Sequence, residues 1–143
     1  METITTTTSK VLYTAKTHTT GGRDHGHAKS SDGHLEINLS SPGTNGTGTN
    51  PEQLFAAGWS ACFEGALGIA ASKSRISLPA DTAIDAEVDL CANKEGFFLQ
   101  ARLNISIPGI DRELAHSLVE IASTICPYSK AIKGNINVEY NLI

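Results

Sequence analysis

The stretch NPEQLFAAGWSACFEGALGIAASKS, from Asn50 to Ser74, decides the fold, because it predicts one long apolar helix with Cys62 near its middle. Asn50 is a good N-cap residue. Pro51 then falls at the first helical position, where its missing N–H group costs nothing. Apolar side chains leave almost no continuous polar face, so we expect this helix to be central and buried on most sides.

The composition is that of a globular chain and favours one domain over residues 1–143. The sequence has 40% hydrophobic and 18% charged residues and a net charge of -4. It has no basic stripe, which excludes a nucleic-acid partner. No uninterrupted apolar run reaches the ~20 residues of a membrane helix, so we expect no membrane partner.

The N-terminus and the cysteine count predict a cytoplasmic protein with thiol chemistry. The first residues, METITTTTSK, lack the basic start and apolar core of a secretory signal. Three cysteines form an odd set, and the cytoplasm is reducing. Reactive thiols are therefore more plausible than a structural disulfide framework.

Strand patterns flank the long helix on both sides. Alternating residues and turn signals predict three strands before it, and two strands, a helix and a final strand after it. This order predicts an α+β fold with antiparallel sheets packed around two central helices. The expected strands are 10–18, 25–30, 34–39, 84–91, 97–107 and 136–142, and the second helix runs from Asp111 to Cys126-Pro127.

Cys62 has two possible interpretations, an inert core residue or a reactive thiol. A cysteine inside a buried helix is usually an inert small hydrophobe. Cys126 favours the other reading, because a thiol at the C-terminal end of the second helix should stay protonated and suits a resolving role. Cys62 lies in mid-helix, away from the helix N-terminus, so as a nucleophile it needs a nearby cation.

Arg23 is the candidate cation. It follows Gly21-Gly22 in an expected loop, and Glu52 in the first helical turn could hold it as a bidentate partner. Each of these residues could equally be a solvated surface charge.

Glu52 and Cys62 lie about 15 Å apart along a straight helix, so they cannot share a site on that helix alone. Either a loop arginine bridges part of the gap, or a second chain supplies the missing group. A stripe of small residues on the helix, Gly58, Gly65 and Gly68 among them, would let another backbone come close. We hypothesise an active homodimer.

Other sites have weaker signals. His25, His27 and His34 could contribute to a metal site, but no CxxC or HExxH companion accompanies them, and we expect no metal. The glycines of residues 43–48 fit no nucleotide-binding fingerprint, and we expect no cofactor. Cys91 alternates with acidic residues on its strand, so we interpret it as a bystander.

Three segments resemble the organic hydroperoxide resistance (Ohr) branch of the Ohr/OsmC family. They are GGRD at Gly21–Asp24, TNPEQLFAAGWSACF at Thr49–Phe63 and CPYSKAIKGNINV at Cys126–Val138. GGRD alone is a weak signal, whereas the other two are long and specific. With the element order between them, the resemblance covers nearly the whole chain.

The resemblance implies a thiol peroxidase that reduces organic hydroperoxides, lipid-derived ones included, to alcohols. It implies an intertwined homodimer with sites at the subunit interface, and a lipoyl-type dithiol reductant such as dihydrolipoamide or a lipoylated protein. Cys62 is similar to the family's peroxidatic cysteine, Cys126 to the resolving cysteine, and Arg23 and Glu52 to its catalytic ion pair.

Around Cys62, the apolar side chains would favour bulky organic peroxides over hydrogen peroxide. The residues that we expect to bind substrate are Leu54, Phe55, Trp59 and Phe63. Two rivals remain: a redox sensor that records oxidation without turnover, and an OsmC-type enzyme with broader substrates.

Overall fold

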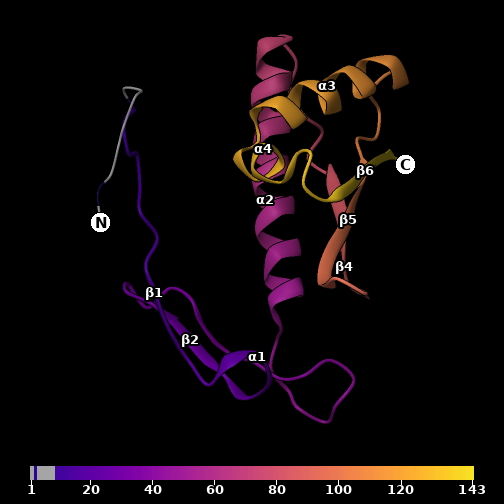
Figure 1. Cartoon of the computed structure of the whole chain (residues 1–143). Helices are drawn as coiled ribbons and strands as arrows, with labels where there is room; N and C mark the ends of the chain where they lie inside the picture. The colour runs from indigo at the N-terminus through magenta and orange to yellow at the C-terminus, as the bar shows by residue number, and fades with distance from the viewer. Residues whose placement is uncertain (1, 3–8) are drawn as a thin grey trace. The chain divides into compact units, whose positions relative to one another are not determined.

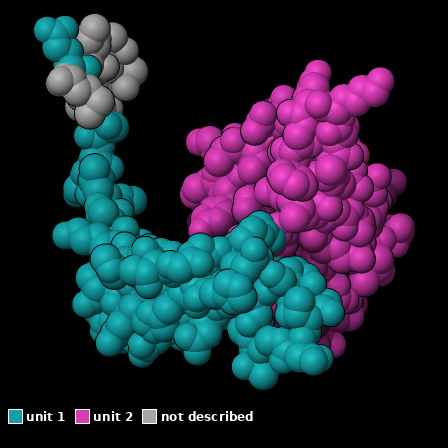
Figure 2. Space-filling view, turned by 60° about the horizontal axis from the view of Figure 1, so that its bottom comes forward, with its two compact units in different colours: residues 1–50 teal, residues 51–143 magenta. Residues whose placement is uncertain are grey.

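The computed structural model describes residue 2 and residues 9–143 of the chain. The chain divides into two compact units, an N-terminal unit of residues 1–50 and a C-terminal unit of residues 51–143, coloured separately in Figure 2. The boundary between them falls directly before the long helix.

The N-terminal unit holds a three-stranded antiparallel sheet in the order β1-β2-β3. Its predicted hairpin is confirmed, with narrower bounds, by the antiparallel pairing of β2 and β3. Asp32 closes the turn by accepting the backbone N–H of His34 at 3.0 Å. The unit's elements are β1 (Thr17–Thr20), α1 (Gly22–His25), β2 (His27–Ser30) and β3 (Glu36–Asn38).

The prediction of a strand over Lys10–His18 is largely wrong for the single chain. β1 begins only at Thr17, and residues 9–16 form no regular secondary structure. Val11, Leu12 and Tyr13 are 77%, 87% and 77% exposed, so nothing in the described part of the chain covers their alternating pattern. A strand pattern requires a neighbouring strand to accept its hydrogen bonds, and no strand among the described residues pairs with residues 9–16.

The C-terminal unit combines three helices and a three-stranded sheet (Figure 1). The long helix α2 packs against β4 and α3. The unit's elements are α2 (Pro51–Lys73), β4 (Ala83–Asn93), β5 (Gly96–Ser106), α3 (Arg112–Ile125), α4 (Pro127–Ile132) and β6 (Asn137–Leu142).

The predicted long hairpin is confirmed, with β4 and β5 antiparallel from Ala83↔Ser106 to the tight turn at Asn93↔Gly96. β6 pairs with β5 in parallel, which departs from the expected antiparallel pairing. Two strands that run the same way need a long crossover, and α3 and α4 supply it. The α+β class itself is confirmed.

The core of the C-terminal unit lies where one stripe of α2 meets the sheet and α3. Buried residues on α2 recur at intervals of three and four, which places them on one helix face. The core side chains with no exposed surface include Trp59, Phe63, Leu67, Leu103, Ile105 and Leu118.

The expectation that α2 is buried on most sides is wrong for the single chain. Ala61, Gly65 and Gly68 lie on an exposed face, and Ile69 on that face is 50% exposed. A Cβ atom added at Gly65 or Gly68 would meet nothing within 4 Å. One side of α2 therefore presents small residues outward.

α2 is also long and apolar enough to cross a membrane, judged by length and composition alone, and it is the one such helix in the described part of the chain. The run-length criterion applied to the sequence missed this, because isolated polar residues interrupt the apolar run. Since its large side chains pack into the core of the C-terminal unit, we interpret α2 as a core helix.

Candidate active site

Two sulfur atoms from distant parts of the sequence meet in the C-terminal unit. Cys62 lies in the middle of α2, and Cys126 lies at the junction of α3 and α4. Their Sγ atoms are 3.4 Å apart, with the Cys126 thiol donating to Cys62. Both are free thiols. Because a disulfide bond is about 2.05 Å long, the pair is in contact but not bonded.

The sequence positions Cys126 through two successive helix ends. Asp111 caps the start of α3 as predicted, by accepting the N–H of Leu114 at 3.3 Å. Cys126 precedes Pro127 and so leaves the helical region, with φ -61° and ψ 118°, which ends α3. Pro127 then occupies the first position of α4, for which its fixed φ is suited.

The expectation that Cys126 lies only at a helix C-terminus is therefore incomplete. The residue is also the N-cap of α4, and its Sγ accepts the backbone N–H of Ser129 at 3.5 Å. The sequence pattern signalled this, since a proline at the first helical position marks a helix start as well as a stop.

Cys62 also lies close to the first turn of α4, where the backbone N–H of Tyr128 favours its thiolate form. Burial raises the pKa of the Cys62 thiol, and so do the hydrogen bond and the charge of Cys126, whereas the Tyr128 N–H lowers it. The net direction is upward. Within the C-terminal unit, the neutral thiol is thus favoured, and a nucleophilic thiolate needs further stabilisation from a cation.

Arg23 lies on the four-residue helix α1, and Glu52 lies at the start of the long helix α2. Arg23 is on α1 in the N-terminal unit, not in a loop as expected, and Gly21 and Gly22, with φ of 78° and 70°, turn the chain into that helix. Glu52 is half-buried in the first turn of α2, ten residues before Cys62.

The four residues expected to bind substrate fall into two groups. Leu54 and Phe55 are half-buried on α2, whereas Trp59 and Phe63 are fully buried. Trp59 and Phe63 belong to the core of the C-terminal unit, and their role in substrate binding stays a prediction.

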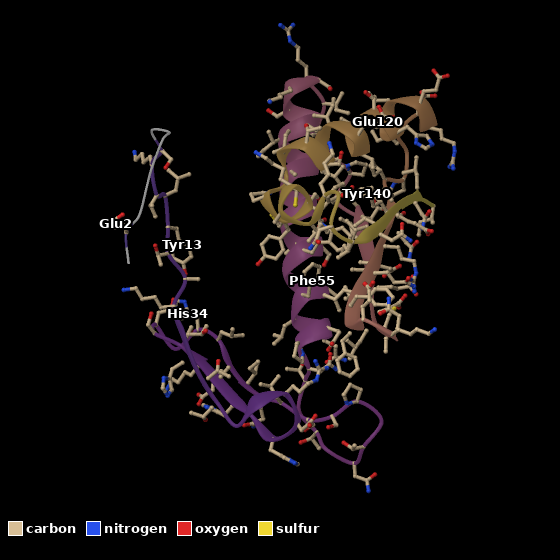
Figure 3. The ribbon with its side chains drawn as sticks, in the orientation of Figure 1. Glu2, Tyr13, His34, Phe55, Glu120 and Tyr140 are labelled. Carbon is tan, nitrogen blue, oxygen red and sulfur yellow. The ribbon has the colours of Figure 1, made fainter. Side chains whose placement is uncertain are left out.

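A chain of aromatic contacts connects the expected substrate side to the core. Phe55 meets Trp59 and Tyr128 edge-on at centroid distances of 6.0 and 6.4 Å. Trp59 meets Tyr140 at 6.2 Å, and Tyr140 stacks on Phe63 at 5.3 Å. Figure 3 labels Phe55 on α2 and Tyr140 on β6.

Sequence reasoning missed Tyr128, which is 45% exposed and lies close to α2. A Cβ atom at Gly58 would come within 3.2 Å of the Tyr128 hydroxyl oxygen, so this glycine allows the ring to approach the helix. The signal was present, because Tyr128 directly follows Cys126-Pro127, but the sequence analysis assigned no role to this residue.

The histidines considered for a metal site contact separate acids. His27 Nε2 lies 2.9 Å from Glu36, and His34 Nδ1 lies 3.3 Å from Asp32. Within residues 9–143, no three His, Cys, Asp or Glu side chains gather as metal ligands would. Cys91 lies opposite Phe98 on the β4–β5 hairpin.

Comparison with known proteins decides the family. The model of the OsmC-like protein family matches residues 41–141, most of the chain. The chain belongs to the OsmC-like family. It is 46% identical over 137 residues to the organic hydroperoxide resistance protein of Xanthomonas axonopodis pv. citri, a match that covers 93% of this chain and 96% of the relative.

Bacillus subtilis OhrB gives the same result in sequence and structure. This organic hydroperoxide resistance protein is 43% identical over 136 residues, covering 92% of this chain and 98% of its own. Its crystal structure matches with a TM-score of 0.87 at 42% identity, over 93% of this chain and 100% of that chain.

A Legionella pneumophila organic hydroperoxide resistance protein matches with a TM-score of 0.86 at 43% identity, over 93% and 98% of the two chains. The resemblance to the Ohr branch is thereby confirmed. The similarity to these relatives indicates that this OsmC-like protein is a redox protein of organic hydroperoxide resistance.

Proposed function

We propose that this protein is a thiol-dependent peroxidase that reduces organic hydroperoxides, lipid-derived ones included, to alcohols. The observation that carries the proposal is the 3.4 Å contact between the sulfurs of Cys62 and Cys126 in a chain of the Ohr branch. Only about 1.4 Å of approach separates this contact from a disulfide bond.

In the first step, the Cys62 thiolate attacks the terminal oxygen of the hydroperoxide ROOH. The O–O bond breaks, the alkoxide leaves, and it takes up a proton to become the alcohol ROH. The sulfur gives up two electrons and keeps the terminal oxygen as a sulfenic acid.

In the second step, the Cys126 sulfur attacks the sulfur of the Cys62 sulfenic acid. An S–S bond forms, the S–O bond breaks, and the hydroxyl group leaves with the thiol proton as water. A lipoyl-type dithiol, either dihydrolipoamide or a lipoylated protein, then reduces the disulfide by exchange. The cycle needs no bound cofactor.

We assign Arg23, oriented by Glu52, to stabilise the Cys62 thiolate. The upward shift of the Cys62 pKa from burial and from Cys126 supports the need for a cation. A positive charge within about 4–6 Å favours the ionised thiol and lowers its pKa. Leu54 and Phe55, both half-buried on α2, would contact the organic part of the substrate.

The proposed active unit is an intertwined homodimer in the cytoplasm, each chain being one OsmC-like domain. Two features of the single chain support a second copy as partner: the exposed small-residue face of α2, and the exposed side chains of Val11, Leu12 and Tyr13. β6 is also an edge strand, which could accept an extended segment.

Sedimentation equilibrium tests the dimer. Gly65→Leu should weaken association by filling the exposed face of α2, whereas Glu120→Leu on the exposed surface of α3 should not. A wild-type monomer with full activity would contradict the dimeric unit.

Steady-state assays test the function. Cumene hydroperoxide and tert-butyl hydroperoxide are compared with hydrogen peroxide, each with dihydrolipoamide and with a monothiol. We expect fast turnover only with an organic peroxide and the dithiol. One round of oxidation without turnover would indicate a redox sensor, and equal rates with all peroxides would indicate a broader OsmC-type enzyme.

A further inference from the structure

Ser129 is a buried polar residue to which the proposed peroxidase cycle assigns no role. Its side chain is 3% exposed, and among the described residues it is the one polar side chain in the buried class. A polar group costs free energy when it is buried unless its hydrogen bonds are satisfied. The contacts of this hydroxyl group therefore deserve an explanation.

The Ser129 hydroxyl connects three elements. Its Oγ accepts the indole N–H of Trp59, on α2, at 3.0 Å. The Ser129 hydroxyl also faces Tyr140 on β6, and this interaction opposes the upward effect of burial on the Tyr140 pKa. The first turn of α4 is thereby attached through one side chain to both the long helix and the sheet.

The same turn contacts both sulfurs. The backbone N–H of Ser129 donates to Cys126 Sγ at 3.5 Å, and the backbone N–H of Tyr128 lies close enough to Cys62 to lower the pKa of its thiol. A contact that holds the first turn of α4 in place therefore also holds the Cys126 sulfur in position relative to the Cys62 sulfur.

We propose that Ser129 is a positioning residue for disulfide closure, acting through the first turn of α4. By holding that turn against Trp59 and Tyr140, Ser129 keeps Cys126 Sγ in line with the S–O bond that breaks in the Cys62 sulfenic acid. This inference rests on the proposed peroxidase function, and it concerns only the second step, in which the S–S bond forms and water leaves.

Ser129→Ala tests the proposal, with Ser123→Ala as its matched control. Both serines line the same cavity of about 340 Å³ beside α4, but the Ser123 hydroxyl bonds only the carbonyl of Glu120 in its own helix. Neither cysteine lines that cavity. Both variants thus remove one hydroxyl oxygen beside the same cavity, but Ser129 is 3% exposed and bonded to Trp59, whereas Ser123 is half-buried and bonded within its own helix.

The measurement is a single turnover with one equivalent of cumene hydroperoxide. Dimedone traps the Cys62 sulfenic acid at each time point, and mass spectrometry counts the trapped acid and the disulfide. Misplacing a reacting group by about 1 Å can slow a reaction ~100-fold. For Ser129→Ala we expect Cys62 oxidation within about twofold of wild type and disulfide closure about tenfold slower, whereas Ser123→Ala should leave both steps within about twofold.

Tyr140→Phe provides a second variant that keeps the ring stacked on Phe63 and removes only the hydroxyl. It should slow closure without slowing oxidation, and it keeps the test decisive if Ser129→Ala does not fold. Wild-type closure rates in both folded variants would overturn the positioning role. Failure of the wild-type protein to oxidise at Cys62 would instead overturn the proposed function.

Trp59 adds a spectroscopic signature, because it is the only tryptophan of the chain. Loss of its hydrogen bond to Ser129 should change its emission in Ser129→Ala and leave it unchanged in Ser123→Ala. Identical emission spectra in wild type and Ser129→Ala would contradict the contact itself.

Discussion

The surroundings of Cys62 and Cys126 differ although their sulfurs touch. Cys62 is half-buried in the middle of a 23-residue helix, whereas Cys126 has no exposed surface and lies where α3 ends and α4 begins. A peroxide arriving from solvent can therefore reach Cys62 but not Cys126. The difference supports a role for Cys62 as the thiol that is oxidised first and for Cys126 as the thiol that reacts only with the resulting Cys62 sulfenic acid.

The largest effect is expected for Cys62→Ser. A serine hydroxyl cannot form a sulfenic acid, so organic peroxide turnover with dihydrolipoamide should fall by about 1,000-fold or more. Steady-state kinetics measure the loss. If Cys62→Ser turned over while Cys126→Ser did not, the assignment of the two thiols would be reversed.

Cys126→Ser should leave the first oxidation intact and block closure. We expect turnover with the dithiol to fall about 10- to 100-fold, with the Cys62 sulfenic acid or its over-oxidised products accumulating. Intact-protein mass spectrometry after peroxide addition detects one, two or three added oxygen atoms. Turnover equal to wild type with the dithiol would contradict a resolving role.

Arg23→Gln should move the pH dependence of Cys62 rather than abolish its chemistry. Burial already raises the pKa of the Cys62 thiol, and removal of a nearby cation raises it further. The midpoint of the pH profile for alkylation of Cys62 by iodoacetamide should therefore move upward by about one pH unit or more. At neutral pH the thiolate fraction and the peroxidase rate fall together.

The matched control for that variant is Lys73→Gln, which removes one positive charge from the exposed last turn of α2. Its alkylation profile should coincide with that of wild type. Coincident profiles for Arg23→Gln and wild type would remove Arg23 from the mechanism.

The smallest effect is expected for Cys91→Ser. Cys91 lies on the β4–β5 hairpin opposite Phe98, outside the contact between the other two sulfurs. Turnover should remain within about twofold of wild type, measured with the same peroxide and dithiol. A loss of tenfold or more would show that the third thiol takes part.

Apart from α4, which was not predicted, the elements of the C-terminal unit were predictable because their signals are local. Pro51 marks the start of α2, Asp111 caps α3, and alternating residues mark β4 and β5. Each depends on hydrogen bonds or periodicity within a few residues. The parallel pairing of β6 was not predictable, since strand direction in a sheet depends on contacts between distant segments.

Two of the failures, at residues 10–16 and on α2, have one cause: the sequence pattern predicts burial, but in the described structure these side chains are uncovered. Val11 and Tyr13 have the alternation of a strand but remain exposed, and Gly65 lies on an uncovered helix face. In the site, the two cysteines could be named from the sequence, but the role of Ser129 depends on Trp59 and Tyr140, which lie 70 and 11 residues away.

Disulfide mapping tests the central claim most directly. The protein, fully reduced and then treated with one equivalent of cumene hydroperoxide, is alkylated, digested and analysed by mass spectrometry. We predict one disulfide per chain, joining Cys62 to Cys126 within the same chain, with Cys91 alkylated. Oxidised protein in which Cys62 and Cys126 are not joined to each other, or in which either is joined to Cys91, would contradict the account.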